Sequence, residues 1–439
     1  MGRWRLRAES ALSLALLRIV VALLMLTAPG FREGAHVAVR ARASWVAPEG
    51  LAWFVRHVPI NGTCATMAQV LVAFAALCAV VGFRPRLCFG VLAVVGFYLF
   101  SIAQLAGHVW HDMHLLWFCA ILATSPCGDA LGLDARRAWW HEGEEYAAPL
   151  WTVRLLLGAV YLFPGVHKLA TSGVGWASSD NLRHQLYWKW AQHGVLPAFR
   201  IDHHAWLLQA AGIGVLVFEL SFVFLMLFRR TRPVAALAGL AFHLASQAIF
   251  LIPFASLWLC YVALVDPRPL GRYLATGGRP ADPIVPLPPA SRPLALPSVI
   301  VGALLLVGAT VQGVRGQTRA YPFAAYPTFD RAPPTDMPDL TMVTVDESGA
   351  RVEIPHARDA SGYRTQRQWA EIWSLAGVTA PVDPARLRAY YARVRPADRS
   401  RETGKERVAF YRVYRSVVPE DRGRLTRTPS LLLELDFTD

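Results

Sequence analysis

The sequence predicts a polytopic α-helical membrane protein with a small α+β domain at its C-terminal end. Hydrophobic residues make up 54% of the 439 residues and charged residues 17%, and the mean hydropathy is +0.33. A soluble protein of this size has roughly a quarter of its residues charged. Apolar runs recur at about the 20-residue length that an α-helix needs to cross a bilayer. We therefore attribute the net charge of +13 to loops that set membrane orientation and expect no nucleic-acid partner.

We expect about nine apolar spans before Gln317. They cover residues 10–28, 65–83, 87–106, 112–126, 150–169, 205–228, 234–250, 252–265 and 297–314. The first span resembles a signal peptide, but Arg18 interrupts it and no clear cleavage site follows, so we expect it to be retained. The two stretches around Ile252-Pro253 are short enough to form a re-entrant pair instead of two crossings.

The basic loops predict the orientation of these spans. If the spans alternate as predicted, four arginine-containing loops share one side, at residues 84–86, 136–137, 229–232 and 268–279. Because cytoplasmic loops carry an excess of arginine and lysine, this side and the N-terminus should be cytoplasmic. The loop with Arg32, Arg40 and Arg42 goes against this rule. We expect a multi-pass cell-membrane protein whose C-terminal domain is extracytoplasmic.

The composition becomes polar at Gln317, which divides the chain into a membrane domain, residues 1–316, and a domain of residues 317–439. A proline-rich linker, residues 280–297, leads into the last span. In the second domain, period-two patterns predict strands and period-3.6 patterns predict helices. We expect strands within residues 342–354, 408–417 and 430–437, and helices at residues 365–376 and 384–395.

Lys168 is the most informative residue of the membrane domain. Of the 44 basic residues, three are lysines, and this one ends the apolar segment 150–169. Arginine stays protonated in proteins, whereas a lysine removed from water can lose its proton and act as a base. A lysine near a helix end can also extend its ammonium group to the membrane surface, which is the structural alternative.

Other polar residues accompany Lys168 inside the predicted spans, and each is costly there unless it is paired or used. They are Arg18, His108, His111, His114, Glu219 and His243. Pro164, four residues before Lys168, should distort its helix as in the broken helices around membrane sites. A lone histidine in such a position is usually a structural hydrogen-bonding group. Together, however, the residues favour one cavity lined by Lys168, His114, His243 and Arg18 that opens toward the external face.

Several of these segments resemble one known family. The resemblance lies in residues 14–20 with 31–34, in His111-Asp-Met-His114, in residues 149–169 with their Gly165-Val-His-Lys168 end, and in residues 242–250. These segments are similar to vitamin K-dependent gamma-glutamyl carboxylases, which share a membrane unit with bacterial HTTM (horizontally transferred transmembrane) proteins. The resemblance covers roughly residues 10 to 265, with the segments in the same order and at similar spacing.

The resemblance implies a carbon–carbon lyase-type enzyme that carboxylates glutamate side chains. In that family a lysine deprotonates reduced vitamin K, the quinol reacts with oxygen, and the resulting strong base removes a proton from the glutamate γ-carbon, to which carbon dioxide adds. By position, Lys168 corresponds to this lysine and His114 to a histidine that assists the quinol. We expect His243, Arg18, His111 and Trp176 to contact reduced vitamin K or another quinol, and we expect no metal.

The chain departs from the family pattern in two places that bear on activity. His167 replaces the first lysine of the family's pair, and a longer insert separates Lys168 from Trp176. The expected external domain is also much smaller than that of the animal carboxylases. A glutamate-containing peptide or protein remains the expected partner, beside the lipid bilayer itself.

Two alternatives come from other functional classes. One is a non-catalytic HTTM scaffold, which predicts that arginine can replace Lys168. The other is a membrane metalloenzyme, because histidines at positions i and i+3 share a helix face. Its ligands would come from His108, His111, His114, His203 and His204.

Overall fold

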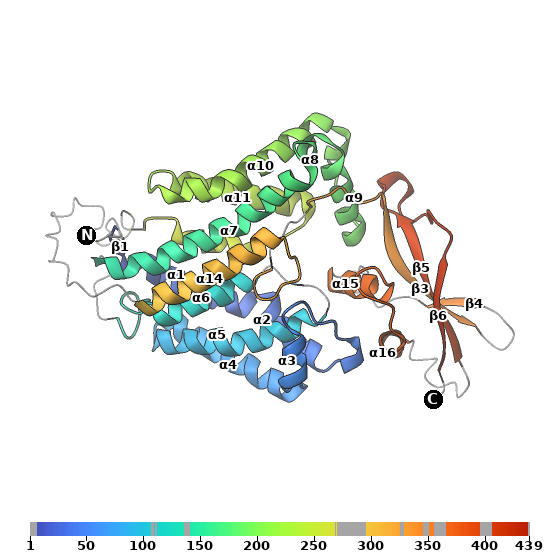
Figure 1. Ribbon diagram of the computed structural model, residues 1–439, viewed down its shortest axis with the longest axis horizontal. Helices are drawn as coiled ribbons and strands as arrows, with labels where there is room; N and C mark the ends of the chain where they lie inside the picture. Colours follow the sequence, from blue (N-terminus) through green and yellow to red (C-terminus); the bar gives the residue numbers. More distant parts are fainter. Residues whose placement is uncertain are drawn as a thin grey trace.

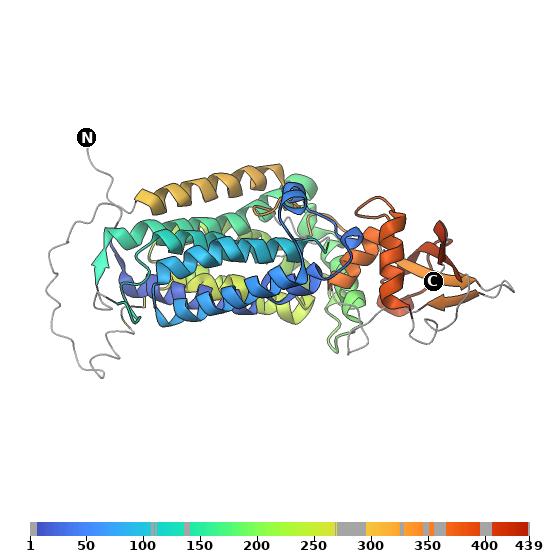
Figure 2. The same cartoon turned by 90° about the horizontal axis from the view of Figure 1, so that it is seen from below.

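The structure is a computed structural model of the whole chain. It describes residues 7–106, 109, 112–135, 141–267, 269, 296–324, 329–345, 351–354, 366–395 and 406–437. A bundle of long helices forms the larger part, and a small sheet with two helices lies at one end of it (Figures 1 and 2). The first helix begins at the opposite end, beside the N-terminus.

Long apolar helices build the bundle. They are α1 (Ala11–Thr27), continued by α2 (Pro29–Ala38), α4 (Gly62–Val81), α5 (Pro85–Gln104), α7 (Ala147–Ser172), α10 (Ala205–Leu227), α11 (Arg232–Phe250) and α14 (Leu296–Arg315). With α1 and α2 counted together, seven helices in the described part of the chain are long and apolar enough to cross a membrane. The protein is therefore a multi-pass membrane protein, as predicted.

Two of the nine expected spans are not long helices. Residues 112–126 form α6 (Met113–Thr124), an apolar helix of 12 residues. Residues 252–265 form the single turn α12 (Ala255–Trp258) and the 3₁₀ segment η4 (Leu259–Ala263). A full crossing needs about 20 helical residues. The count of nine is thus not confirmed, because hydropathy registers an apolar segment whether or not it forms a long helix.

Shorter elements connect the long helices at both ends of the bundle. They are β1 (Glu9–Ser10), η1 (Arg42–Ser44), α3 (Ala52–His57), β2 (Glu142–Gly143), η2 (Glu144–Tyr146), α8 (Gly175–Ser178), α9 (Asn181–His193) and η3 (Ile201–His203). The α4–α5 and α10–α11 turns, which contain two of the predicted basic loops, lie at the N-terminal end (Figure 1). Residues 136–137 and most of 268–279 lie outside the described residues. The cytoplasmic assignment of this end stays a prediction.

The C-terminal region contains a four-stranded antiparallel sheet in the order β4-β3-β5-β6. Its elements are β3 (Asp336–Val345), β4 (Arg351–Ile354), α15 (Gln366–Leu375), α16 (Pro384–Val394), β5 (Glu406–Ser416) and β6 (Ser430–Phe437). All of these elements were expected, although β3 begins six residues before the predicted strand. Leu340, Phe410 and Tyr391 belong to the core between the sheet and the two helices.

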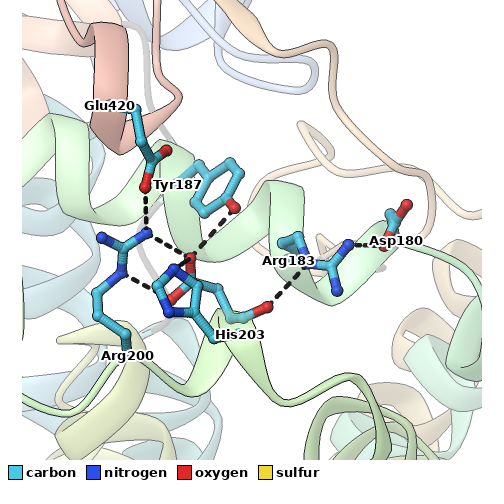
Figure 3. Close-up of polar contacts among 7 residues, drawn as sticks. Asp180, Arg183, Tyr187, Arg200, His203 and Glu420 are labelled. Carbon is cyan, nitrogen blue, oxygen red and sulfur yellow. Dashed lines mark hydrogen bonds and ion pairs between the residues drawn. The ribbon is translucent and has the colours of Figure 1, made fainter.

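A polar cluster joins this region to α9 and η3 (Figure 3). The Arg200 guanidinium donates to both carboxylate oxygens of Asp202, at 2.8 and 2.6 Å, and to Glu420 of the C-terminal region, at 2.8 Å. The Asp202 side chain is fully buried and also accepts from the Tyr187 hydroxyl at 3.2 Å. The C-terminal region is therefore held to α9 and η3 by specific side-chain contacts.

Candidate functional site

A cavity of about 500 Å³ lies among α6, α7, α10, α11 and α12. Its walls are mainly aliphatic and aromatic, and Lys168 and Glu219 are its two charged lining residues among those described. The remaining polar lining residues are His114, Tyr161, His243 and Ser246. A largely apolar cavity with a few convergent polar groups is the usual form of a small-molecule site.

Helix α7 presents three of the lining residues along one face. Tyr161, Pro164 and Lys168 follow one another at helical spacing, so their side chains lie on the same side. Pro164 has no N–H group, which removes the bond that the carbonyl of Val160 would accept in a regular helix. Val160 also lines the cavity. Helix α7 is continuous through Pro164, and the carbonyl that lacks this hydrogen bond belongs to a residue at the site.

Lys168 forms an ion pair with Glu219 of α10, and both side chains are buried. The helices approach closely here, because a Cβ atom on Gly165 would lie 3.0 Å from the Glu219 Cβ. The Lys168 Nζ also lies 5.0 Å from the centre of the Trp176 ring, a cation–π contact. Lys168 thus faces a cavity, and its side chain is paired inside the protein instead of extending from its surface.

A second polar group lies on the same cavity. The Tyr161 hydroxyl contacts His243 Nε2 at 2.6 Å and also contacts the Tyr261 hydroxyl, which lies 3.2 Å from the same histidine nitrogen. These residues come from α7, α11 and η4, respectively. The apolar segment around Ile252-Pro253 therefore contributes to the site although it is not a long helix.

His114 lies at the start of α6, where its Nε2 is 2.8 Å from the carbonyl oxygen of Ser256. The Ser256 hydroxyl in turn donates to Asp112 at 2.6 Å. His114 lines the cavity together with Lys168, His243 and Trp176, so the structure brings four of the six predicted site residues together. His111, and also His108, lie outside the described residues.

The segment before β3 covers the cavity at the end nearer the sheet. Phe329 lines the cavity, and its ring stacks on Phe250 with 5.4 Å between the centres. Its carbonyl oxygen accepts hydrogen bonds from Trp176 Nε1 at 2.5 Å and from Asn181 Nδ2 at 3.3 Å. Trp176 thus fixes this segment while its ring packs against Lys168.

The sequence matches the HTTM domain over residues 6–265, which is more than half of the chain. The protein belongs to the HTTM domain family. No curated protein and no solved structure matches the chain. All described lining residues of the cavity except Phe329 fall inside the matched region. The C-terminal sheet lies outside it.

Arg18 of the HTTM domain does not line the cavity, which corrects the expectation that it would. Its guanidinium donates to the carbonyl oxygens of Cys127 at 3.1 Å and Ala130 at 3.0 Å, and also to Leu131. A buried arginine can be satisfied by backbone carbonyls as well as by a ligand. Arg18 therefore holds the loop after α6 against α1.

Sequence reasoning missed three residues of the site. Glu219 was noted as a costly residue in its span but was not assigned a partner, and Tyr161 and Tyr261 were not singled out. A glutamate in an apolar span is a detectable signal. The hydroxyls of tyrosines in apolar segments give no such signal, because tyrosine is also common as an apolar packing residue.

In the described part of the chain, no group of three or more histidine, cysteine, aspartate or glutamate side chains is placed to hold a metal ion. His203 lies on η3 and His204 just after it, and neither lines the cavity. His204 stacks on Phe199 with 5.4 Å between the ring centres. The charged groups at the cavity, among the described residues, are the ion-paired Lys168 and Glu219.

Proposed function

We propose that this HTTM protein is a quinol-dependent carboxylase-like enzyme in which Lys168 acts as the base. One observation carries the proposal: a buried lysine pairs with a buried glutamate at the wall of an apolar cavity within the membrane domain. The resemblance of residues 149–169 to the carboxylases is the second support. The substrates would be reduced vitamin K or another membrane quinol, oxygen, carbon dioxide and a glutamate-containing peptide.

The cavity fits a quinol in size and chemistry. Its volume of about 500 Å³ lies within the range of small-molecule sites, and aromatic side chains such as Trp117, Phe218 and Phe242 offer flat apolar contact. Among the described residues that line the cavity, two buried polar atoms have no hydrogen-bond partner, Oε2 of Glu219 and Nδ1 of His243. Such orphaned atoms are costly unless a ligand or water satisfies them. Glu219 and His243 would therefore hold the quinol's polar groups.

A bound quinol supplies ionisable hydroxyl groups and reducing electrons for reaction with oxygen. The protein must supply a proton acceptor in an apolar site. We infer that the proton on Lys168 Nζ moves to Glu219, which converts the ion pair into a neutral amine and a carboxylic acid without changing the total charge. A neutral amine and a carboxylic acid avoid the cost of keeping two charges out of water in the apolar cavity. The Lys168 amine then accepts a proton from the quinol hydroxyl.

The other lining residues orient the reaction and exclude water. His114 is fixed by the Ser256 carbonyl, and the Tyr161–His243–Tyr261 group is fixed by mutual contacts. The apolar walls would protect a strong base and a carbanion from protonation by water. In the scaffold alternative, the Lys168–Glu219 pair serves to hold α7 against α10.

Quinol oxidation by purified protein separates these alternatives. Lys168→Arg keeps the positive charge but removes the proton acceptor, so quinol should still bind while oxygen-dependent oxidation falls by about 10²–10⁴-fold. Lys189→Arg is the matched control, because Lys189 does not line the cavity. Equal oxidation rates in the wild type and Lys168→Arg would remove the assignment of Lys168 as the base. A wild type that binds no quinol would favour the scaffold.

A further inference from the structure

A second pocket, of about 310 Å³, is lined by the turn between α10 and α11, and none of its described lining residues belongs to the Lys168 cavity. This turn lies at the N-terminal end of the bundle (Figure 1). Four arginines line it: Arg7, Arg229, Arg230 and Arg232. Arg154 lies beside them, and the nearby carboxylates are Glu9 and Asp266. Among the described residues, these five arginines less the two carboxylates leave a net charge of +3 around this pocket.

Part of the cluster is fixed in place. Glu9 Oε1 accepts from Arg154 at 2.6 Å and from Arg232 at 3.0 Å, and the Arg232 Nε donates to the carbonyl oxygen of Met226 at 3.0 Å. Both guanidinium groups also lie over the Trp151 ring, with their central carbons 5.7 and 4.9 Å from its centre. The floor of the pocket is therefore preorganised.

Two further arginines are available to a ligand, whereas Arg229 pairs with Asp266 at 2.8 Å. Arg7 and Arg230 are exposed, and neither forms an ion pair with a described residue. The apolar rim is equally exposed: Phe228, in the turn that lines the pocket, is 66% accessible. The outer faces of α10 and α11 continue from it with exposed Phe224 and Leu237. Positive charge thus borders a surface suited to acyl chains.

We propose that this pocket binds the phosphate group of an anionic phospholipid, whose acyl chains lie along α10 and α11. Guanidinium groups match phosphate oxygens in geometry and charge. A soluble phosphate would use the arginines but not the exposed Phe228, Phe224 and Leu237. The juxtamembrane position and the apolar faces therefore favour a lipid over a free phosphate. The site lies in the leaflet nearest the N-terminus, and it does not depend on the quinol chemistry proposed above.

Native mass spectrometry or a binding titration with detergent-purified protein measures lipid binding at this pocket. The probes are a phosphatidylglycerol, a phosphatidylcholine of the same acyl chains, and inorganic phosphate. We expect saturable binding of phosphatidylglycerol that weakens by about five-fold in Arg230→Gln, the usual effect of one arginine at a lipid surface. Arg84→Gln is the matched control, since Arg84 is an exposed arginine in the α4–α5 turn and does not line the pocket.

Each other outcome overturns a defined part of the proposal. Equal weakening in Arg84→Gln and Arg230→Gln would show diffuse attraction to the surface instead of a site. Binding of inorganic phosphate as tightly as phosphatidylglycerol would assign the pocket to a soluble phosphate. Equal binding of phosphatidylglycerol and phosphatidylcholine would show that the arginines do not distinguish an anionic lipid from one without net charge. The lipid-binding measurement does not depend on quinol oxidation. It can therefore be interpreted even if the protein has no carboxylase activity.

Discussion

The ammonium group of Lys168 donates a hydrogen bond to the Glu219 carboxylate, and this pair joins α7 to α10 inside the membrane domain. Each charge alone would be costly in this apolar setting, and each compensates the other. The pair therefore has two separable consequences. It stabilises the contact between two helices, and it places an amino group and a carboxylate at the wall of a cavity.

Stability and activity should separate in variants of this pair. Glu219→Ala leaves the Lys168 charge unpaired and should lower the free energy of unfolding by about 3–5 kcal/mol. The double variant Lys168→Met/Glu219→Leu replaces both charges by apolar groups and should recover most of that loss while staying inactive. Denaturant or thermal unfolding in detergent measures the first effect and quinol oxidation the second. A double variant that is as unstable as Glu219→Ala would show that the charges themselves hold the fold.

The Tyr161 hydroxyl should matter more for turnover than for folding. Tyr161→Phe keeps the ring but removes the contacts to His243 and Tyr261, which should lower the free energy of unfolding by about 1–3 kcal/mol. We expect kcat for quinol oxidation to fall while KM changes little, because the ring still packs in the cavity. Tyr98→Phe is the control, since that hydroxyl binds the Pro59 carbonyl outside the cavity. A change in KM alone would make Tyr161 a binding residue.

Docking of the C-terminal sheet should depend on Arg200 far more than on Glu420. Arg200→Ala leaves the fully buried Asp202 carboxylate without its guanidinium partner, whereas Glu420→Ala removes a carboxylate that is 60% exposed. Limited proteolysis between the bundle and the sheet should accelerate by about 5- to 30-fold in Arg200→Ala. Glu420→Ala should change it little, because exposed ion pairs contribute little. Equal acceleration of proteolysis in both variants would contradict the larger contribution of Arg200 to docking.

Much of the fold could be read from the sequence because it depends on local patterns. The long apolar helices and the strands and helices of residues 336–437 follow from hydropathy and periodicity, which report on each segment by itself. The failures involve contacts between segments. Arg18 was assigned to the cavity because an arginine in a span needs partners, but the partners turned out to be carbonyls of the loop after α6.

The site was partly predictable for the same reason. Polar residues in apolar segments, and residues in the family-like motifs, can be recognised in the sequence. This signal identified four residues that the cavity brings together: Lys168, His114, His243 and Trp176. Glu219 was visible as a costly residue, but it lies 51 positions from Lys168 and no local pattern pairs them. Tyr261 lies in a segment interpreted as a span, so its place beside His243 follows only from the folded chain.

Lys189 should give the folded protein a measurable pH dependence. It lies on α9 outside the membrane helices, and burial lowers its pKa from 10.5 to about 8. Between these two values the unfolded chain binds more protons than the folded one, so stability should rise with pH. This contribution is complete above pH 10.5 and is lost as the pH falls through about 8.

Lys189→Met removes this titration, so it should raise the thermal midpoint at pH 7 and flatten its rise between pH 8 and 10.5. Lys189→Arg, which stays charged, should be less stable than the methionine variant over the whole window. Thermal unfolding in detergent at several pH values measures both. A thermal midpoint that falls between pH 8 and pH 10 in the wild type, but not in the Lys189 variants, would contradict the predicted rise of stability with pH.

The most direct test of the central claim is incorporation of labelled carbon dioxide into a glutamate-containing peptide by the purified protein, with and without quinol and oxygen. The account predicts incorporation that requires both quinol and oxygen, that is lost in Lys168→Arg, and that persists in Lys189→Arg. Incorporation that persists in Lys168→Arg would contradict the role of Lys168. No incorporation by the wild type with any membrane quinol, despite intact folding, would contradict the carboxylase assignment.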